Sequence, residues 1–409
     1  MISAVKAPTA RISATPYLLL IAIAFFTLFF RLGALPFLGS DECRYARIAE
    51  EMSGARQWVP PILEGLPWLE KPPLYYWITI PMIRWFGMSE MAARLSSVFC
   101  SLAGIALVVW LGSRLWSSRA GFLSGLILLT GTGYCAYARS ASTDMPFTAS
   151  FTIAVAVLAS AVLETEASWW RIGCAYIFLG LAVLAKGPVA WILAAGILLL
   201  FWVFDEQGGS LRRAHVFWGA LLSAVVALPW FWLAFRQNGF SFVSIFFINH
   251  NFARYVTDVH HHDQPIFYFI PVLGGLFFPW SGWLPVLIPD ALRGKIRNWR
   301  SWDRRTIFLL SWALFPFLFF SLSSSKLPGY VLPCMPPIAL LLSRRLQEIL
   351  ENKPAGSKLR LTRWFALTMS LLFAIALPIV FQIEYGGAWK SGLFIALALQ
   401  VLYVILPIL

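Results

Sequence analysis

Long apolar runs recur along the whole 409-residue chain and limit what it can fold into. A helix needs about 20 apolar residues to cross the hydrocarbon core of a bilayer, and runs of that length repeat here. The chain is 59% hydrophobic and only 12% charged, about half the charged fraction of an ordinary soluble domain. We predict an all-α polytopic integral membrane protein with about twelve spans, near residues 17–36, 92–113, 120–138, 145–163, 170–185, 187–204, 215–235, 266–288, 306–322, 329–347, 363–382 and 389–409.

The connectors between these runs are short, which bears on domain organisation. No stretch free of a predicted span exceeds about 55 residues, which leaves no room for a separate soluble domain. We therefore expect residues 1–409 to form a single transmembrane domain with two long outer loops, at 37–91 and 236–265. The apolar segment 72–87 resembles a span, but a crossing there would invert every later connector. We interpret it as a juxtamembrane element of the first outer loop.

The net charge of +13 fits a membrane protein better than a nucleic-acid binder. The basic residues lie in short connectors between spans rather than in one interleaved patch, as the positive-inside rule describes. This distribution predicts a cytoplasmic N-terminus. The two long loops then lie on the outer side of the membrane.

The segment GSDECRYARIAEEM, residues 39–52, concentrates charge at the start of the first outer loop. Asp41 can cap a helix, and Tyr45, Ile48, Ala49 and Met52 would form its apolar face at spacings of three and four residues. Such a helix suits the membrane surface. The charged residues that would point elsewhere are Arg44, Arg47, Glu50 and Glu51.

A second carboxylate lies in ARSASTDMPF, where Asp144 follows one predicted span and precedes a proline that opens the next. Helix N-capping alone can explain Asp144, as an amphipathic surface helix alone can explain Asp41. Two carboxylates on one membrane face are also what a transfer reaction needs to hold an acceptor and activate its nucleophile. Both interpretations stay open at this stage.

Cations and tyrosines accompany the carboxylates on the predicted outer face. Lys71 lies in LEKPP, Arg254 in NFARY and Lys326 in SSSKLPGY. Arginine binds a phosphate bidentately and lysine binds it as a point charge, so the three could hold a lipid-linked phosphate. Snorkelling to lipid headgroups is the alternative for each. The tyrosines interleaved with them are Tyr45, Tyr75, Tyr255 and Tyr330.

Two further groups give weaker signals. His260, His261, His262 and Asp263, with Glu70 in the other loop, could hold a structural divalent metal, but adjacent histidines cannot all face one ion and zinc spacing is missing. We therefore expect no required cofactor. Lys186, in LAKGPV, either reaches the outer loops or simply ends a helix.

These motifs, in their order, carry a resemblance: DECRYARIAEEM, GARQWVPPILEGLPWLEKPPLYYW, FGMSEMAARLSS, ARSASTDMPF, LAKGPV and SSSKLPGYVLP. Together they resemble the bacterial lipid A aminoarabinose transferase family. That family belongs to the GT-C group of polyprenyl-phosphate-dependent glycosyltransferases, which is related to protein O-mannosyltransferases. The resemblance covers most of the first 340 residues and implies a GT-C fold with amphipathic juxtamembrane helices in the first outer loop. Cys43 departs from the small residue or proline common in the first motif.

The resemblance also implies roles for individual residues. Asp41 and Asp144 match the family's two catalytic aspartates, and Lys71 and Arg254 match its binders of the donor phosphate. Lys326 and Tyr330 match its KLP-x-Y motif, interpreted as a further element on the phosphate side. Other residues expected at the active site are Glu42, Arg44, Tyr45, Glu70 and Tyr75.

The implied activity is an inverting glycosyl transfer at the periplasmic face of the bacterial inner membrane, by a multi-pass protein whose N-terminus is cytoplasmic. The expected donor is undecaprenyl phosphate carrying aminoarabinose, and the expected acceptor is lipid A. Transfer of a hexose to another glycolipid, a polysaccharide or a protein hydroxyl is the alternative. A secondary transporter is a weaker one, because it predicts ionisable residues in mid-span. Family members continue into a soluble outer domain, which we expect to be absent here.

Overall fold

The structure, a computed structural model, describes residues 14–164, 168–205, 208–256, 264–287 and 302–352. Apart from a two-stranded antiparallel hairpin, β1 (Ile62–Leu63) with β2 (Leu66–Pro67), the secondary structure of this part is helical, which confirms the all-α prediction. The helices are α1 (Thr15–Phe29), α2 (Gly39–Ala55), α3 (Leu74–Phe86), α4 (Glu90–Leu115), α5 (Ser118–Thr130), α6 (Thr132–Ala138), α7 (Asp144–Leu163), α8 (Trp169–Lys186), α9 (Val189–Phe204), α10 (Ser210–Arg213), α11 (Val216–Asn238), α12 (Phe240–Phe242), the π-helix η1 (Val243–Ala253), α13 (Arg254–Val256), α14 (Phe269–Leu276), the 3₁₀-helix η2 (Trp280–Leu287), α15 (Arg304–Ser321), the 3₁₀-helix η5 (Pro328–Cys334) and α16 (Met335–Asn352).

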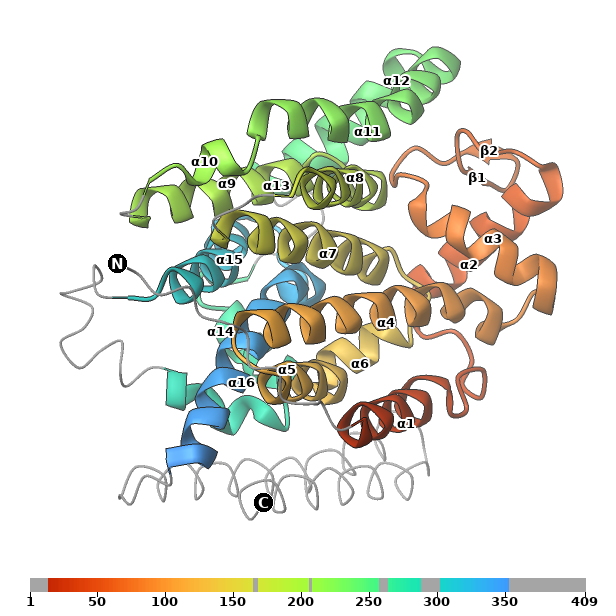
Figure 1. Cartoon of the computed structure of the whole chain (residues 1–409). Coiled ribbons are helices and arrows are strands. Elements are labelled where there is room, and N and C mark those ends of the chain that lie inside the picture. Colours follow the sequence, from red (N-terminus) through yellow and green to blue (C-terminus); the bar gives the residue numbers. More distant parts are fainter. Residues whose placement is uncertain (1–13, 165–167, 206–207, 257–263, 288–301, 353–409) are drawn as a thin grey trace.

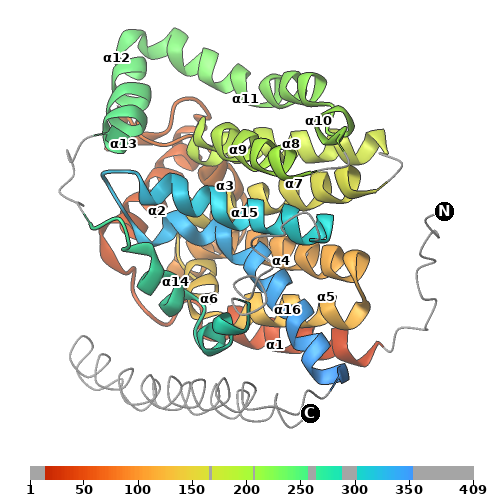
Figure 2. The ribbon, with the colours of Figure 1, turned by 90° about the vertical axis from the view of Figure 1, so that its left-hand side faces the viewer.

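Helix α7 lies at the centre of the bundle, between α4 and α8 (Figure 1). Every residue from 145 to 162 is buried. The helix is rich in alanine, serine and threonine, and small side chains let neighbouring membrane helices approach closely. On another side of the bundle α15 and α16 run next to each other (Figure 2). The central position of α7 fixes its first residue, Asp144, at one end of the bundle.

Several described helices can cross a bilayer. Five are long and apolar enough, namely α4, α7, α8, α11 and α15, while α1 and α9 are apolar but shorter. The pair α5 and α6 makes a sixth candidate, bent by 67°. The spans predicted near 363–382 and 389–409 lie outside the described residues. The protein is thus a multi-pass membrane protein, and the count of twelve spans stays a prediction.

Two predicted continuous spans are broken in the structure. The span near 120–138 bends after Gly131, where the side-chain hydroxyl of Thr132 donates to the carbonyl of Phe278 at 2.7 Å. The span near 266–288 is divided between α14 and η2. Pro279 disfavours helical backbone at the residue before it, which explains why one helix does not continue. Hydropathy alone does not report such breaks.

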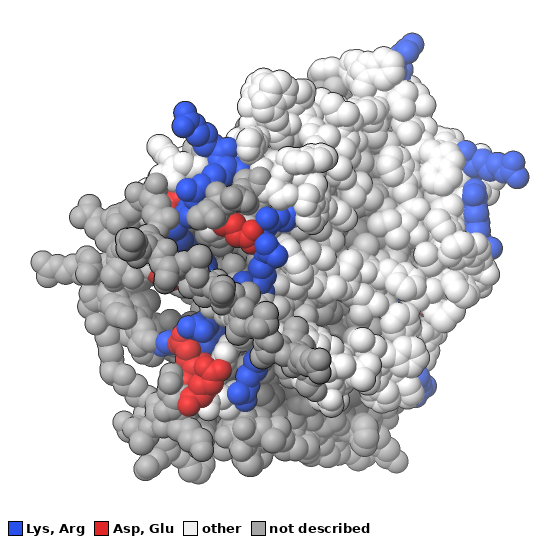
Figure 3. Space-filling model, viewed as in Figure 1, with Lys and Arg blue, Asp and Glu red and all other residues white. Residues whose placement is uncertain are grey.

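Charge is distributed unevenly over the described surface. In the view of Figure 3, charged side chains gather at two sides of the molecule, and a broad area between them carries none. A transporter would place ionisable groups in mid-span. Asp144 instead begins α7, and Lys186 ends α8.

Helices α2 and α3 and the hairpin form a layer beside the bundle, within the predicted first outer loop (Figure 1). The predicted apolar face of α2, formed by Tyr45, Ile48, Ala49 and Met52, is buried. It packs on α3, however, in a small core that includes Tyr75 and Tyr76. The expected capping role of Asp41 is wrong: Leu38 is the N-cap residue, no side chain caps the helix, and Asp41 lies in the first turn.

Candidate active site

The first feature of the site is an ion pair between helix ends. The Asp144 carboxylate, in the first turn of α7, accepts a hydrogen bond from the ammonium of Lys186 at the last residue of α8. Both side chains keep part of their surface accessible, 24% for Asp144 and 16% for Lys186. The interpretation of Asp144 as an N-cap is wrong, because Thr143 occupies that position. The open question about Lys186 is also answered, since it does reach the site.

Two glycines allow this close arrangement. Gly187 ends α8 with φ of +91°, a conformation that side chains with a Cβ rarely adopt, and it lies against Phe246. At Gly329 an added Cβ would lie 3.1 Å from the Asp144 Oδ1 atom and 3.0 Å from the Tyr137 hydroxyl. The absence of a side chain at Gly329 lets the KLPGY segment pack directly on Asp144.

The next residue, Tyr330, lies between two cations. Its ring centroid is 5.4 Å from the Lys186 ammonium nitrogen and 5.8 Å from the Arg254 guanidinium carbon. Both distances suit cation–π contacts, which favour a cation over an aromatic face. Asp144, Lys186, Tyr330 and Arg254 therefore form one continuous group, although 110 residues of sequence separate Asp144 from Arg254.

Arg254 is positioned by unusual backbone. The predicted outer loop 236–265 is helical through residue 256, and Arg254 directly follows the π-helix η1. Such π-helical turns are rare and are often found at functional sites. The Arg254 Nε atom is buried and has no hydrogen-bond partner among the described residues. A buried donor of this kind is costly unless a ligand satisfies it.

Lys71 and Glu70 extend the group from the first outer loop. Burial, and after it the nearby positive charges of Arg254 and Lys186, lower the pKa of Lys71 to about 8, against the opposing effects of Asp144 and Glu70. Burial raises the pKa of Glu70, while Lys71, Arg44 and Arg254 act in the opposite direction. Glu70 also lies 3.6 Å from the His250 Nε2 atom on η1. We call Asp144, Lys186, Arg254, Tyr330, Lys71 and Glu70 together the rim cluster.

Asp41 lies at the exposed side of this cluster. Its side chain is 64% exposed and accepts a hydrogen bond from Arg44 at 3.1 Å. Tyr45 is buried nearby: burial raises the pKa of its hydroxyl, and the charges of Asp41 and Asp144 add to that effect. Arg44 also lies over the Trp68 ring at 5.4 Å. The structure thus brings both expected aspartates to one region.

Glu42 is turned away from that region. It is 5% exposed and accepts hydrogen bonds from Arg94 at 2.8 and 3.2 Å and from the backbone N–H groups of Leu38 and Ala141, both at 2.6 Å. Burial raises the pKa of Glu42, but these hydrogen bonds outweigh it and the net shift is downward. Glu42 therefore holds structure together beside Asp41.

Arg94 is a residue that the sequence analysis did not single out. Its guanidinium also donates to the carbonyls of Leu32, Leu35 and Pro36, at 3.0, 2.8 and 2.8 Å. It thereby joins the segment after α1 to α2 and α4. A signal was present, because Arg94 lies inside the predicted span 92–113 and a buried arginine needs polar partners.

Two other expected site residues have structural partners. Lys326 is 6% exposed, and its ammonium donates to the carbonyls of Gln264 at 2.8 Å and Ser323 at 2.6 Å. Tyr75 is buried, and its hydroxyl donates to the carbonyl of Ala93 at 3.0 Å. These bonds fix both side chains within the fold.

A metal centre finds no support in the described part of the chain. No group of three or more histidine, cysteine, aspartate or glutamate side chains there is arranged to hold an ion. His260, His261, His262 and Asp263, the residues for which a metal was considered, lie outside the described residues.

Comparisons with known proteins agree on one family. Residues 17–246 match the family model described as dolichyl-phosphate-mannose-protein mannosyltransferase. Among curated relatives, the undecaprenyl phosphate-alpha-4-amino-4-deoxy-L-arabinose arabinosyl transferase of Yersinia enterocolitica is 32% identical over 363 residues, which are 86% of this chain. The enzyme of the same description from Edwardsiella ictaluri is 34% identical over 343 residues, 81% of this chain. The matches span 62% and 59% of those two relatives.

Solved structures show the same relationship in three dimensions. ArnT from Cupriavidus metallidurans bound to undecaprenyl phosphate has a TM-score of 0.81 at 26% identity, covering 97% of this chain and 72% of that one. The archaeal oligosaccharyltransferase AglB from Archaeoglobus fulgidus, in complex with an inhibitory peptide and a dolichol-phosphate, has a TM-score of 0.55 at 14% identity. The superposition covers 93% of this chain and 55% of the AglB chain, and at this identity it supports the fold alone.

Proposed function

Because the chain belongs to the dolichyl-phosphate-mannose-protein mannosyltransferase family, we propose that it transfers a sugar from a polyprenyl phosphate carrier to an acceptor at the outer face of the membrane. The proposed donor is undecaprenyl phosphate carrying aminoarabinose, which is the donor given in the names of the relatives of this chain. The proposed acceptor is lipid A. The proposed location is the bacterial inner membrane, with the active site facing the periplasm.

The rim cluster is the observation that carries this proposal. A polyprenyl phosphate donor presents one phosphate at the membrane boundary. Arg254 and Lys71 supply two cations that lie near each other, since the charge of Arg254 lowers the pKa of Lys71. Arg254 has an unsatisfied buried donor, the Nε atom, among the described residues. A phosphate oxygen accepts such a hydrogen bond well, since charge-assisted bonds from guanidinium to phosphate are strong.

The proposed reaction is one displacement at the anomeric carbon. The acceptor oxygen forms a bond to that carbon while the bond from the carbon to the phosphate oxygen breaks, and the electron pair leaves with the polyprenyl phosphate. Lys71 and Arg254 stabilise the negative charge that develops on this leaving group. A single displacement inverts the anomeric configuration.

The carboxylates act on the acceptor side of the same reaction. Asp41 is exposed and adjacent to the cluster, so it takes the proton of the acceptor hydroxyl or orients an acceptor that is already ionised. Asp144 is held by Lys186 and positions the acceptor next to the sugar. In this assignment Lys186 fixes the direction of the Asp144 carboxylate.

The proposed function is tested by supplying the purified protein in lipid with radiolabelled undecaprenyl-phosphate aminoarabinose and lipid A. Label recovered on lipid A, with inverted anomeric configuration by NMR, supports the donor and the acceptor. Label transferred only from a hexose donor, or only to a protein or polysaccharide hydroxyl, supports the family reaction with another substrate. No transfer from any polyprenyl phosphate sugar contradicts the proposal.

A further inference from the structure

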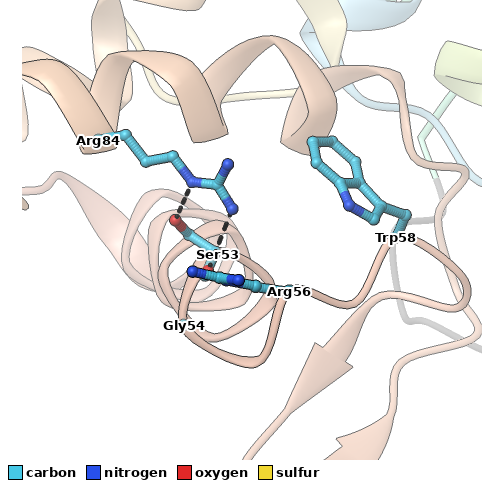
Figure 4. A pocket seen from close by; sticks show the side chains of 5 residues that line it. All are labelled: Ser53, Gly54, Arg56, Trp58 and Arg84. Carbon is cyan, nitrogen blue, oxygen red and sulfur yellow. Dashed lines mark hydrogen bonds between the residues drawn. The ribbon is translucent and has the colours of Figure 1, made fainter.

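A surface pocket outside the rim cluster lies where α2 ends and α3 ends. It is lined by Ser53, Gly54, Arg56, Trp58 and Arg84 (Figure 4). Asp41 and Ser53 are separated by twelve residues of α2, about 18 Å along a helix that rises 1.5 Å per residue. The pocket is therefore distinct from the proposed reaction centre.

The pocket is positively charged. Two of its five lining side chains are arginines, and none is a carboxylate. The guanidinium of Arg84 donates to the hydroxyl of Ser53 at 3.2 Å and to its carbonyl at 3.4 Å, and it lies 5.9 Å from the centre of the Trp58 ring. Arg84 is thus held rigidly over the end of α2.

Arg56 differs from Arg84 because its side chain has no ion-pair or hydrogen-bond partner among the described residues. It follows α2 in a left-handed conformation, with φ of +52°. In the view of Figure 4 its guanidinium lies below that of Arg84, with Ser53 between them and Trp58 on the other side of the pocket. Two like charges that face one cavity repel each other unless an anion lies between them.

Exposed aromatic residues place this pocket at the edge of the bilayer. Trp58 is 44% exposed, Trp85 is 75% exposed and Phe86 is 55% exposed. Tryptophan is enriched at the level of lipid headgroups, where its ring is amphipathic. An anion reaching the pocket from this direction would be a lipid phosphate.

We propose that Arg56 and Arg84 bind the headgroup phosphate of an acidic membrane lipid, with Trp58 packing beside it. The site is additional to the proposed transfer reaction, since it shares no residue with the rim cluster. It would anchor the α2 and α3 layer to the membrane surface on which the reaction takes place. An arginine near an anionic membrane contributes about 1 kcal/mol, about a fivefold change in affinity.

The test is native mass spectrometry of the 409-residue chain in detergent, titrated with phosphatidylglycerol, phosphatidylcholine or inorganic phosphate. Arg56→Gln leaves the bonds of Arg84 to Ser53 intact, and Arg84→Gln removes the second cation. The charge-matched control is Arg47→Gln, on the same helix, because Arg47 is paired with Glu50 and Glu51. Melting temperatures of all variants check the fold.

We expect phosphatidylglycerol to bind about fivefold more weakly to each pocket variant and unchanged to the control. Phosphatidylcholine, whose headgroup is neutral overall, is expected to bind weakly to all of them. Equal affinity of Arg56→Gln and the unchanged protein contradicts the proposal, as does an equal loss in Arg47→Gln. Inorganic phosphate binding as tightly as phosphatidylglycerol overturns the lipid as the source of the anion.

Discussion

Glu42 and Arg94 form a buried ion pair, with 2.8 Å between the Oε2 and Nη2 atoms, that joins α2 to α4. Glu42 directly follows Asp41, and it also holds the backbone N–H of Ala141, three residues before Asp144. One buried carboxylate therefore contacts the segments that carry both candidate catalytic aspartates. The relative position of Asp41 and Asp144 depends on this pair.

Breaking the pair is expected to destabilise the protein. Arg94→Ala leaves the Glu42 carboxylate buried without its cation, and loss of one partner of a buried pair typically costs about 3–5 kcal/mol. Thermal unfolding of the purified protein in detergent should show a clear fall in melting temperature. The control Glu50→Gln removes a carboxylate from an exposed pair on α2, the helix that carries Glu42, and should change the melting temperature little. Equal melting temperatures for Arg94→Ala and Glu50→Gln would contradict the role of the pair.

Asp144 and Lys186 are expected to act as one unit in transfer. Asp144→Asn and Lys186→Met should each reduce the transfer rate, and the double variant should lose much less than the sum of the two effects. Residues in direct contact typically show coupling of about 0.5–3 kcal/mol. A double-mutant cycle on kcat/KM measures it, and strict additivity would show that the ion pair has no role in the reaction.

Donor binding is expected to weaken in alkaline solution. The pKa of Lys71 is lowered from 10.5 to about 8, so the side chain is a cation below pH 8 and loses its charge above it. The profile of kcat/KM for the donor should therefore fall as pH rises through about 8, since it reports groups of the free enzyme. Lys71→Arg should remove this fall because arginine keeps its charge. The same fall in both proteins would assign it to another group.

The same shift has the opposite effect on folding stability. Between pH 8 and 10.5 the unfolded chain binds a proton at Lys71 that the folded chain has released. Stability therefore rises with pH in this window, while donor binding falls. Unfolding measured at pH 7.5 and 9.5, for the unchanged protein and Lys71→Met, separates the two effects. Here Lys71→Met should lose the pH-dependent rise, and an equal rise in both would show that Lys71 is not its source.

Arg254 is expected to determine donor affinity. Arg254→Gln should raise KM for the polyprenyl phosphate sugar by about tenfold or more, because a charge-assisted hydrogen bond contributes about 1.5–3 kcal/mol. Arg236→Gln is a suitable control, since Arg236 lies against Trp232 at the end of α11, outside the rim cluster. Steady-state kinetics with varied donor measures the effect. An unchanged KM in Arg254→Gln would remove Arg254 from the phosphate site.

The sequence was most informative where one physical signal dominates. Apolar length predicted the helices, and the three-and-four spacing of Tyr45, Ile48, Ala49 and Met52 predicted the buried face of α2. The surface that covers this face was not predictable, because periodicity marks an apolar side without naming its partner. The structure shows that this face packs on α3.

The contacts of the rim cluster were beyond sequence reasoning for a related reason. Asp144, Lys186 and Arg254 are far apart in the chain, and they meet where the backbone packs closely at Gly187 and Gly329. Glu42 lies next to Asp41 and was expected at the same active site, but helical geometry turns adjacent residues by about 100°. Of two neighbouring carboxylates, one is exposed and the other is buried on Arg94.

The most direct test of the central claim is single-turnover transfer by Asp41→Asn, in lipid, with saturating labelled donor and acceptor at matched folded yield. The matched control is Glu50→Gln, which changes another solvent-accessible carboxylate of α2. If Asp41 activates the acceptor, its variant should transfer sugar at least about 100-fold more slowly, with donor binding retained and the control unaffected. Transfer by Asp41→Asn at the rate of the unchanged protein would contradict the account.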